Sequence, residues 1–228
     1  MKLAVYAVTD ARSVPPATGV RGEHLRLYRA GPIAAVAGEV RSAPAAVPDN
    51  LRRYDGTLRH LAASLPALLP VRFGTCVADA EELGMILRSR QAALRRALGR
   101  VRNRVQMTVR VVGALPGGDP SDGVDARAGR RPEPRRAAAA GTQYLRARAD
   151  AAARAREVPG FEPVRAAVRR WLRDERVERR GPTASVYHLI PRAAAGAYQR
   201  AVIRAAAAAG LPVVVSGPWP AYAFAETW

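Results

Sequence analysis

The chain has 228 residues, and 49% of them are apolar, which is enough to bury one large or two small cores and excludes a disordered protein. No apolar run approaches the roughly 18 residues that a membrane-spanning helix requires, so we expect no membrane partner. The net charge of +18 favours acidic partners such as nucleic acid. However, the arginines are spread over nearly every segment rather than gathered into one stripe, and their GC-rich codons offer a genomic explanation for much of the charge.

Two features of the chain are typical of a cytoplasmic protein. Residues 2–9 form a short apolar run that ends at Asp10 without a small-residue cleavage site, which predicts a strand rather than a signal peptide. Cys76 is the only cysteine, so no disulfide can form within the chain, as expected for a reducing compartment.

The first half of the chain has the pattern of three strands followed by a helix. We predict strands at residues 2–9, 25–28 and 33–37, and the short connection around Gly31 indicates that the last two form a hairpin. Apolar residues then recur every three or four positions, which predicts an amphipathic helix that ends before Pro66. The residues of its apolar face are Leu51, Tyr54, Leu58, Leu61 and Leu65.

Residues 69–75, with the sequence L-P-V-R-F-G-T, form an apolar segment that contains a single arginine. Charged side chains are rarely buried without a partner, so Arg72 either faces solvent at a strand edge or pairs with a buried acceptor. We expect a buried acceptor, supplied by Glu81, Glu82 or the C-terminal tail, which would hold the corner between this strand and the next helix.

The next elements are a helix and a strand. The D-x-x-E spacing of residues 79–82 predicts a capping box at the start of a helix over residues 80–99, whose arginines form a solvated face. Residues 105–111 then alternate between apolar and polar side chains, which predicts a strand with one wet face. We expect this strand to close a first domain that covers residues 1–113.

The second half begins with a change of composition. Residues 114–136 hold almost no large apolar side chains and are rich in proline, glycine and arginine, which predicts a flexible linker or an extended surface loop. We expect a second α+β domain over residues 137–216. Its predicted helices lie near residues 138–157, from about residue 164 to an end by Gly181, and at residues 193–209. Its predicted strands lie at residues 185–190 and 211–216.

The last twelve residues, 217–228, carry four aromatic side chains and have no regular period. A flexible tail does not normally expose so much apolar surface. We therefore expect these residues to form a docking tail that occupies a groove, either on this chain or on a partner.

The sequence contains no recognisable arrangement of catalytic or ligand-binding residues. His24, His60 and His188 do not share metal-ligand spacing, and no glycine-rich phosphate loop is present. Cys76 lies close to a predicted helix start, which can lower a thiol pKa, but no histidine lies near it in the sequence. We therefore predict no enzyme activity, no catalytic, cofactor-binding or metal-binding residues, and no small-molecule substrate.

Several segments, in the right order along nearly the whole chain, resemble motifs of the gas vesicle protein F/L family. Residues 69–75 and the E-E-L that begins at Glu81 are similar to the family's L-P-[LV]-R-F-G-T and its helix start. Residues 141–145 are similar to a G-x-x-Y-L motif, and residues 216–224 are similar to the terminal S-G-P-W-P-P-Y-[SN]-F. Gln106 stands where the family often has an acidic residue. If that acidic residue pairs with the motif arginine in the family, Arg72 needs a different acceptor in this chain.

The resemblance implies an α+β protein of two domains, the second a modified ferredoxin-like domain, with an extended aromatic C-terminal tail that packs against the first. It implies a non-enzymatic accessory or minor structural protein of gas vesicle assembly, located in the cytoplasm and the gas vesicle. The partners would be the small hydrophobic shell protein and other gas vesicle accessory proteins. The structural or interaction residues that it implies are Arg72, Phe73, Gly74, Tyr144, Trp219, Tyr222 and Phe224.

Two other functions stay open at this point. The positive charge supports a basic nucleic-acid-binding protein, although the scattered arginines indicate no specific nucleic-acid site. A small-molecule enzyme of ferredoxin-like fold would need a pocket with a perturbed titrating group, and the sequence offers no candidate for it.

Overall fold

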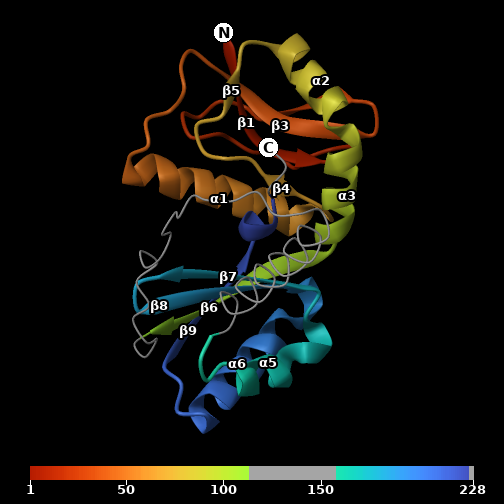
Figure 1. Cartoon of the computed structure of the whole chain (residues 1–228). Coiled ribbons are helices and arrows are strands. Elements are labelled where there is room, and N and C mark those ends of the chain that lie inside the picture. The colour runs from red at the N-terminus through yellow and green to blue at the C-terminus, as the bar shows by residue number, and fades with distance from the viewer. Residues whose placement is uncertain (113–157, 226–228) are drawn as a thin grey trace, which may run out of the picture.

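The computed structural model describes residues 1–112 and 158–225, which form two antiparallel sheets covered by helices (Figure 1). The first sheet lies in the upper half of Figure 1 and the second in the lower half, with helix α1 (Pro48–Ser64) between them. This arrangement confirms the predicted α+β class.

The first sheet has the strand order β2-β3-β1-β4, and β5 also pairs with β1. The predicted hairpin is confirmed, because β2 and β3 pair from Ala30 and Ile33 outward and Gly31 takes the left-handed conformation that the tight turn requires. The strands are β1 (Lys2–Thr9), β2 (Arg26–Ala30), β3 (Ile33–Val40), β4 (Leu69–Pro70) and β5 (Cys76–Val77).

Both faces of the first sheet are covered, which explains why β1 and β3 are apolar almost throughout. On one face, Tyr54, Leu58 and Leu61 of α1 pack in a core with Tyr6 and Val36. The other face is covered by α2 (Ala80–Ser89) and α3 (Gln91–Val101). Their buried leucines are Leu83, Leu87, Leu94 and Leu98.

The single helix predicted over residues 80–99 is wrong, since α2 ends and α3 begins at Arg90. No glycine or proline marks the break. Instead α2 lies on β2 and β3 while α3 lies on β3 and β4, so the bend lets both helices follow the sheet. The predicted capping interaction at the start of α2 is confirmed: the Asp79 carboxylate accepts from the Glu82 amide at 2.9 Å, and the Glu82 carboxylate accepts from the Ala78 amide at 2.5 Å.

The second sheet has the order β7-β8-β6-β9, and all of its neighbouring strands are antiparallel. The strands are β6 (Arg104–Val112), β7 (Asp174–Arg180), β8 (Thr183–Pro191) and β9 (Val213–Trp219). β6 therefore pairs with β8 and β9, which corrects the expectation that this strand closes the first domain. Alternation along the strand identifies it as β-structure, but it does not say which sheet supplies the partners.

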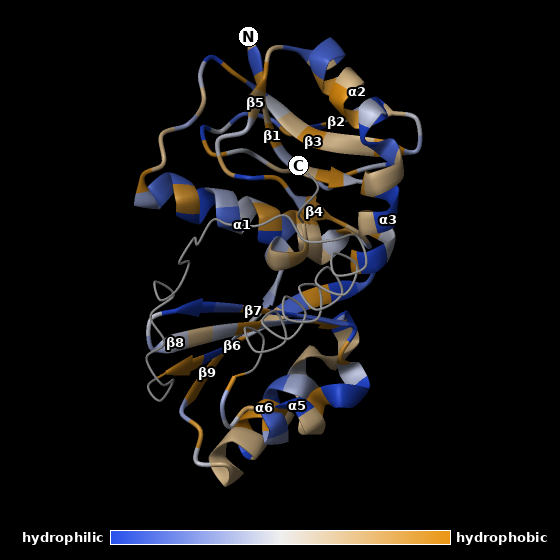
Figure 2. Ribbon diagram, viewed as in Figure 1, coloured by the Kyte–Doolittle hydropathy of each residue, from blue (hydrophilic) through white to orange (hydrophobic). Residues whose placement is uncertain are grey.

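Two further strand predictions need correction. β7, with the sequence D-E-R-V-E-R-R, falls where we predicted the end of a helix, but it forms an edge of the second sheet. It is drawn mostly in the hydrophilic colour in Figure 2. Charged side chains are common on edge strands because one side of the backbone faces solvent. β9 continues to Trp219, so residues 217–219 belong to the sheet and not to an irregular tail.

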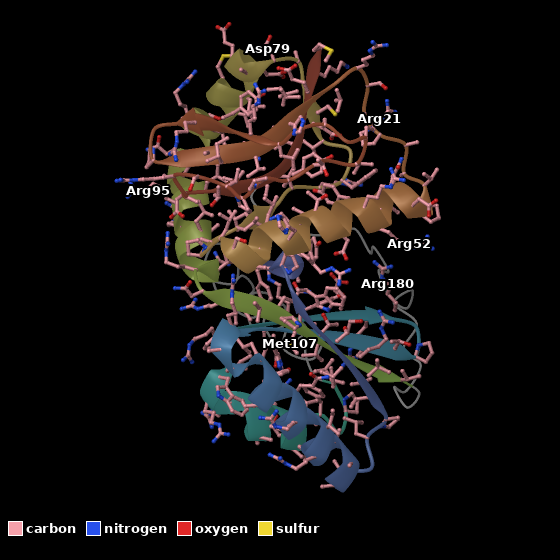
Figure 3. All side chains as sticks on the ribbon, turned by 180° about the vertical axis from the view of Figure 1, so that it is seen from behind. Arg21, Arg52, Asp79, Arg95, Met107 and Arg180 are labelled. Carbon is pink, nitrogen blue, oxygen red and sulfur yellow. The ribbon has the colours of Figure 1, made fainter. Side chains whose placement is uncertain are left out.

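One face of the second sheet is covered by α5 (Glu162–Val168) and α6 (Ala195–Ala208), with the 3-10 turn η1 (Arg169–Trp171) after α5 and η2 (Arg192–Ala194) before α6. Met107 of β6 is fully buried in this core (Figure 3). The helix predicted over residues 193–209 is confirmed, as is its end at Gly210 in the left-handed conformation. The core residues that join the sheet to these helices include Val109, Phe161, Val164, Val168, Val186, Tyr198 and Val202.

Some predictions fall on residues that the structure does not describe. These are the linker at residues 114–136, the helix near 138–157 and the motif residue Tyr144. Over the described part of the chain, none of the helices has the length and apolar character needed to cross a membrane.

Candidate interaction site

Arg72 is exposed, which corrects the expectation that it pairs with a buried acceptor. The corner between β4 and α2 is instead held by aromatic contacts and backbone hydrogen bonds. The Tyr54 hydroxyl donates to the carbonyl oxygen of Val71, and the ring of Phe73 packs edge-on against Tyr54, with the two ring centroids 5.2 Å apart. Gly74 takes a left-handed φ of 81°, and Thr75 donates through its hydroxyl to the Arg72 carbonyl at 2.8 Å.

Helix α1 contacts this corner and also residues 219–225, which we call the C-terminal segment. The Tyr222 hydroxyl donates to a carboxylate oxygen of Asp55 at 2.8 Å, and the same carboxylate pairs with Arg59 at 2.8 Å. The Arg59 guanidinium in turn lies 5.1 Å from the centre of the Trp219 ring, a cation–π contact. Burial and the hydrogen bond to Asp55 raise the pKa of Tyr222, so this phenol stays protonated as the donor.

The C-terminal segment also contacts the core of the first half and strand β6. Phe224, in the 3-10 turn η3 (Tyr222–Phe224), is 2% exposed and belongs to the same buried cluster as Val5 and Leu87 of the first half. The Ala223 amide donates to the side-chain oxygen of Gln106 in β6 at 2.7 Å. The structure thus places Trp219 and Tyr222 beside α1 and Phe224 in the buried cluster of the first half.

Gln106 of β6 is buried where the C-terminal segment crosses the second sheet. It is 4% exposed, and its carbonyl oxygen satisfies a backbone amide of the C-terminal segment. This corrects the expectation that the polar face of the strand is wet, because Gln106 and Thr108 on that face are both buried. Alternation places the two residues on one face, but it does not show that the C-terminal segment covers that face.

A cavity of about 290 Å³ lies where these elements meet. Its walls come from the end of α1, the start of β6, η2 and the end of β9, and most of its lining is apolar. Three arginines line it as well. The lining residues are Arg59, Ala62, Ala63, Pro66, Leu68, Val101, Arg104, Val105, Arg192, Pro218, Trp219, Pro220 and Ala221. We call this cavity the junction pocket.

A second concavity, of about 590 Å³, is basic rather than apolar. Arg12, Arg29, Arg95 and Arg102 line it, and Asp10, the one carboxylate of the lining, forms a salt bridge with Arg102. Arg95 projects from α3 at the edge of the molecule (Figure 3). These arginines form a local cluster rather than a stripe along the surface.

The second core contains a chain of titrating side chains. His188 is fully buried, with Nδ1 lying 2.6 Å from the Tyr198 hydroxyl and Nε2 lying 2.8 Å from a carboxylate oxygen of Glu175. Arg165 donates to both oxygens of Glu175 at 3.1 Å. Burial raises the pKa of Glu175, but the hydrogen bonds from His188 and Arg165 outweigh it and bring the pKa to about 2. Because His188 has no exposed surface, the arrangement fits a structural network better than a catalytic one.

The other candidate groups show no catalytic arrangement. Cys76 lies in β5 rather than at a helix start, and burial raises the pKa of its thiol. Within residues 1–112 and 158–225, no three His, Cys, Asp or Glu side chains are placed to hold a metal ion.

Comparisons with known proteins agree with this geometry. The family model described as gas vesicle synthesis protein GvpL/GvpF matches residues 3–226. The fold is similar to the crystal structure of gas vesicle protein GvpF from Microcystis aeruginosa, with a TM-score of 0.71 and 13% identity over 99% of each chain. It is also similar to GvpF from Anabaena sp. PCC7120, with a TM-score of 0.71 and 15% identity over 99% of this chain and 96% of that one. No curated protein sequence matches. Because the family model covers nearly the whole chain, the protein belongs to the GvpL/GvpF family of gas vesicle synthesis proteins.

Proposed function

We propose that this protein is a non-enzymatic accessory or minor structural protein of gas vesicle assembly, which acts in the cytoplasm and at the vesicle. Its partners in this proposal are the small hydrophobic shell protein and other gas vesicle accessory proteins. The observation that carries the proposal is the family match over residues 3–226. Exposed apolar surfaces aggregate, so a hydrophobic shell subunit needs a partner that shields it before it polymerises.

The proposal assigns separate roles to the two halves. Residues 137–216 together with β6 would form a modified ferredoxin-like domain, and the strand order β7-β8-β6-β9 with α5 and α6 in the two crossovers supports this. Residues 217–228 would act as a docking tail on the first half, and the contact of Tyr222 with Asp55 supports this role. The motif residues Arg72, Phe73 and Gly74 would then contribute to shape and surface rather than to chemistry.

The direct test is a vesicle complementation experiment. A host that carries a gas vesicle gene cluster without its F/L-family member receives the full chain, and flotation and electron microscopy report whether vesicles form. Co-expression with the shell protein, followed by pull-down, reports direct contact. We expect both signals to be present, and absence of shell-protein binding in repeated trials overturns the direct-contact part of the proposal.

Nucleic-acid binding remains the second candidate because of the basic concavity lined by Arg12, Arg29, Arg95 and Arg102. Non-specific attraction to phosphates falls steeply with salt and ignores sequence. We expect only this weak behaviour with duplex DNA. Affinity that persists at high salt and depends on sequence would favour the nucleic-acid function instead.

A further inference from the structure

The junction pocket contains charge that no described residue neutralises. Of its three arginines, Arg59 pairs with Asp55. Arg104 donates only to the backbone carbonyl of Arg100, and no salt bridge to Arg104 or Arg192 is present within the described residues. Two positive charges therefore face an apolar pocket whose described lining contains no carboxylate.

Arg192 is the more constrained of the two. Its terminal nitrogens donate to the carbonyl oxygens of Ala63 at 2.8 Å and Leu65 at 3.0 Å, which fixes the guanidinium beside the end of α1. Its Nε is buried and has no hydrogen-bond partner in the part of the chain that the structure describes. A guanidinium has five N–H groups, so these contacts leave a second N–H on each terminal nitrogen for another acceptor.

The remaining surface of the pocket is apolar. Ala62, Pro66, Leu68 and Val105 line one part of it, and the ring of Trp219 lies among the other lining residues. A volume of about 290 Å³ suits one or two aliphatic side chains rather than a large cofactor. The complementary ligand is thus an apolar group that carries a carboxylate.

We propose that the junction pocket binds an apolar segment of a partner protein through one acidic side chain, whose carboxylate pairs with Arg192 and Arg104. This inference rests on the proposed function, because it names the chemistry by which the protein would hold a hydrophobic assembly partner. Carboxylate–guanidinium pairs give both energy and orientation, while the apolar walls contribute burial of the neighbouring side chains.

The test uses the full chain and two fluorescent heptapeptides of the form serine, leucine, leucine, X, leucine, leucine, serine, where X is glutamate in one peptide and glutamine in the other. Fluorescence anisotropy measures both affinities. We expect the glutamate peptide to bind about tenfold more tightly, because only its carboxylate can form charge-assisted hydrogen bonds with Arg192 and Arg104. Added salt should reduce this preference.

Variants of the protein test the charged part and the apolar part of the pocket separately. Arg192→Gln should abolish the preference for glutamate, and Ala63→Phe should weaken both peptides because Ala63 is an exposed helix position where a larger side chain fills the cavity. Arg52→Gln is the matched control, because Arg52 lies on the same helix as Ala63 and is not among the lining residues of the pocket (Figure 3). Among the described residues, its salt-bridge partner is Asp49. Thermal melts of each variant confirm that it is folded.

Three results overturn the inference: no binding of either peptide, equal affinity of the unmodified protein for the two peptides, or undiminished affinity of the Ala63→Phe variant. These outcomes are distinct from failure of the proposed function. If the protein prefers the glutamate peptide but supports no vesicle formation, the inferred binding site stands and the proposed gas vesicle function fails. If the protein supports vesicle formation but shows no preference for the glutamate peptide, the proposed function stands and the inferred binding site fails.

Discussion

The two sheets of this protein bury their central strands in different ways. In the first sheet, β1 is covered by α1 on one face and by α2 and α3 on the other, and its interior is apolar except for hydroxyl groups such as those of Tyr6 and Thr9. In the second sheet, α5 and α6 cover one face, and the buried chain of Tyr198, His188 and Glu175 lies on that side.

The remaining face of the second sheet turns toward the first half. Leu189 of β8 belongs to the buried cluster of the first sheet, and Gln106 of β6 binds the backbone of the C-terminal segment. The first sheet therefore depends mainly on apolar burial, whereas the second combines apolar burial with polar contacts whose strength depends on charge. Mutations and pH should affect the two differently.

The largest effect should come from the doubly covered sheet. Leu58 of α1 has no exposed surface, so Leu58→Ala removes buried methyl groups and leaves a cavity. We expect the free energy of unfolding to fall by about 2–5 kcal/mol, as is typical for such a truncation. Urea denaturation of the two proteins at neutral pH measures it. If Leu58→Ala lowers the unfolding free energy by no more than an exposed-surface substitution does, the result contradicts the tight packing of this sheet.

The second sheet should be the one that responds to acid. The pKa of Glu175 is about 2 in the folded protein against an ordinary value of 4.5, so its stabilisation is complete above pH 4.5 and is lost as the pH falls toward 2. Glu175→Gln removes this component and should cost about 1–3 kcal/mol at neutral pH, because Arg165 and His188 lose a charged partner.

Denaturation between pH 2 and pH 7 tests this prediction. The unfolding free energy of the unmodified protein should decline more steeply below pH 4.5 than that of Glu175→Gln. Parallel pH profiles would show that the network around His188 does not stabilise the fold, and the contrast between the two sheets would then fail.

A smaller effect is expected where the C-terminal segment meets α1. Tyr222→Phe removes the hydroxyl that donates to Asp55 while keeping the ring in place. We expect a loss of about 0.5–1.5 kcal/mol in unfolding free energy. Asp55→Asn in the same background should then add less than it does alone, and fully additive losses in this double-mutant cycle would argue against a direct contact.

The smallest effect should come from the family motif itself. Arg72 is exposed, and within the described residues its side chain forms no salt bridge, so Arg72→Ala should change the unfolding free energy by no more than about 0.5 kcal/mol. A loss of several kcal/mol would instead support the buried ion pair that we expected from the sequence. If stability is unchanged but shell-protein binding falls, Arg72 acts at a surface.

Local structure could be predicted from the sequence where a short pattern determines it. The three- and four-residue spacing of Tyr54, Leu58 and Leu61 predicted α1, and the spacing of Asp79 and Glu82 predicted the start of α2. Such patterns depend on neighbours within one or two turns, so no distant contact is needed to interpret them. The motif at residues 69–75 likewise identified the family without reference to the fold.

Only the tertiary structure decided how these elements combine. It paired β6 with β8 and β9, bent the chain at Arg90, and placed the charged segment 174–180 at a sheet edge. It also left Arg72 in solvent and brought Arg192 to the carbonyl groups at the end of α1. Each of these outcomes depends on residues far apart in the chain, because strand pairing and burial follow from which surfaces meet, and a one-dimensional pattern does not contain that information.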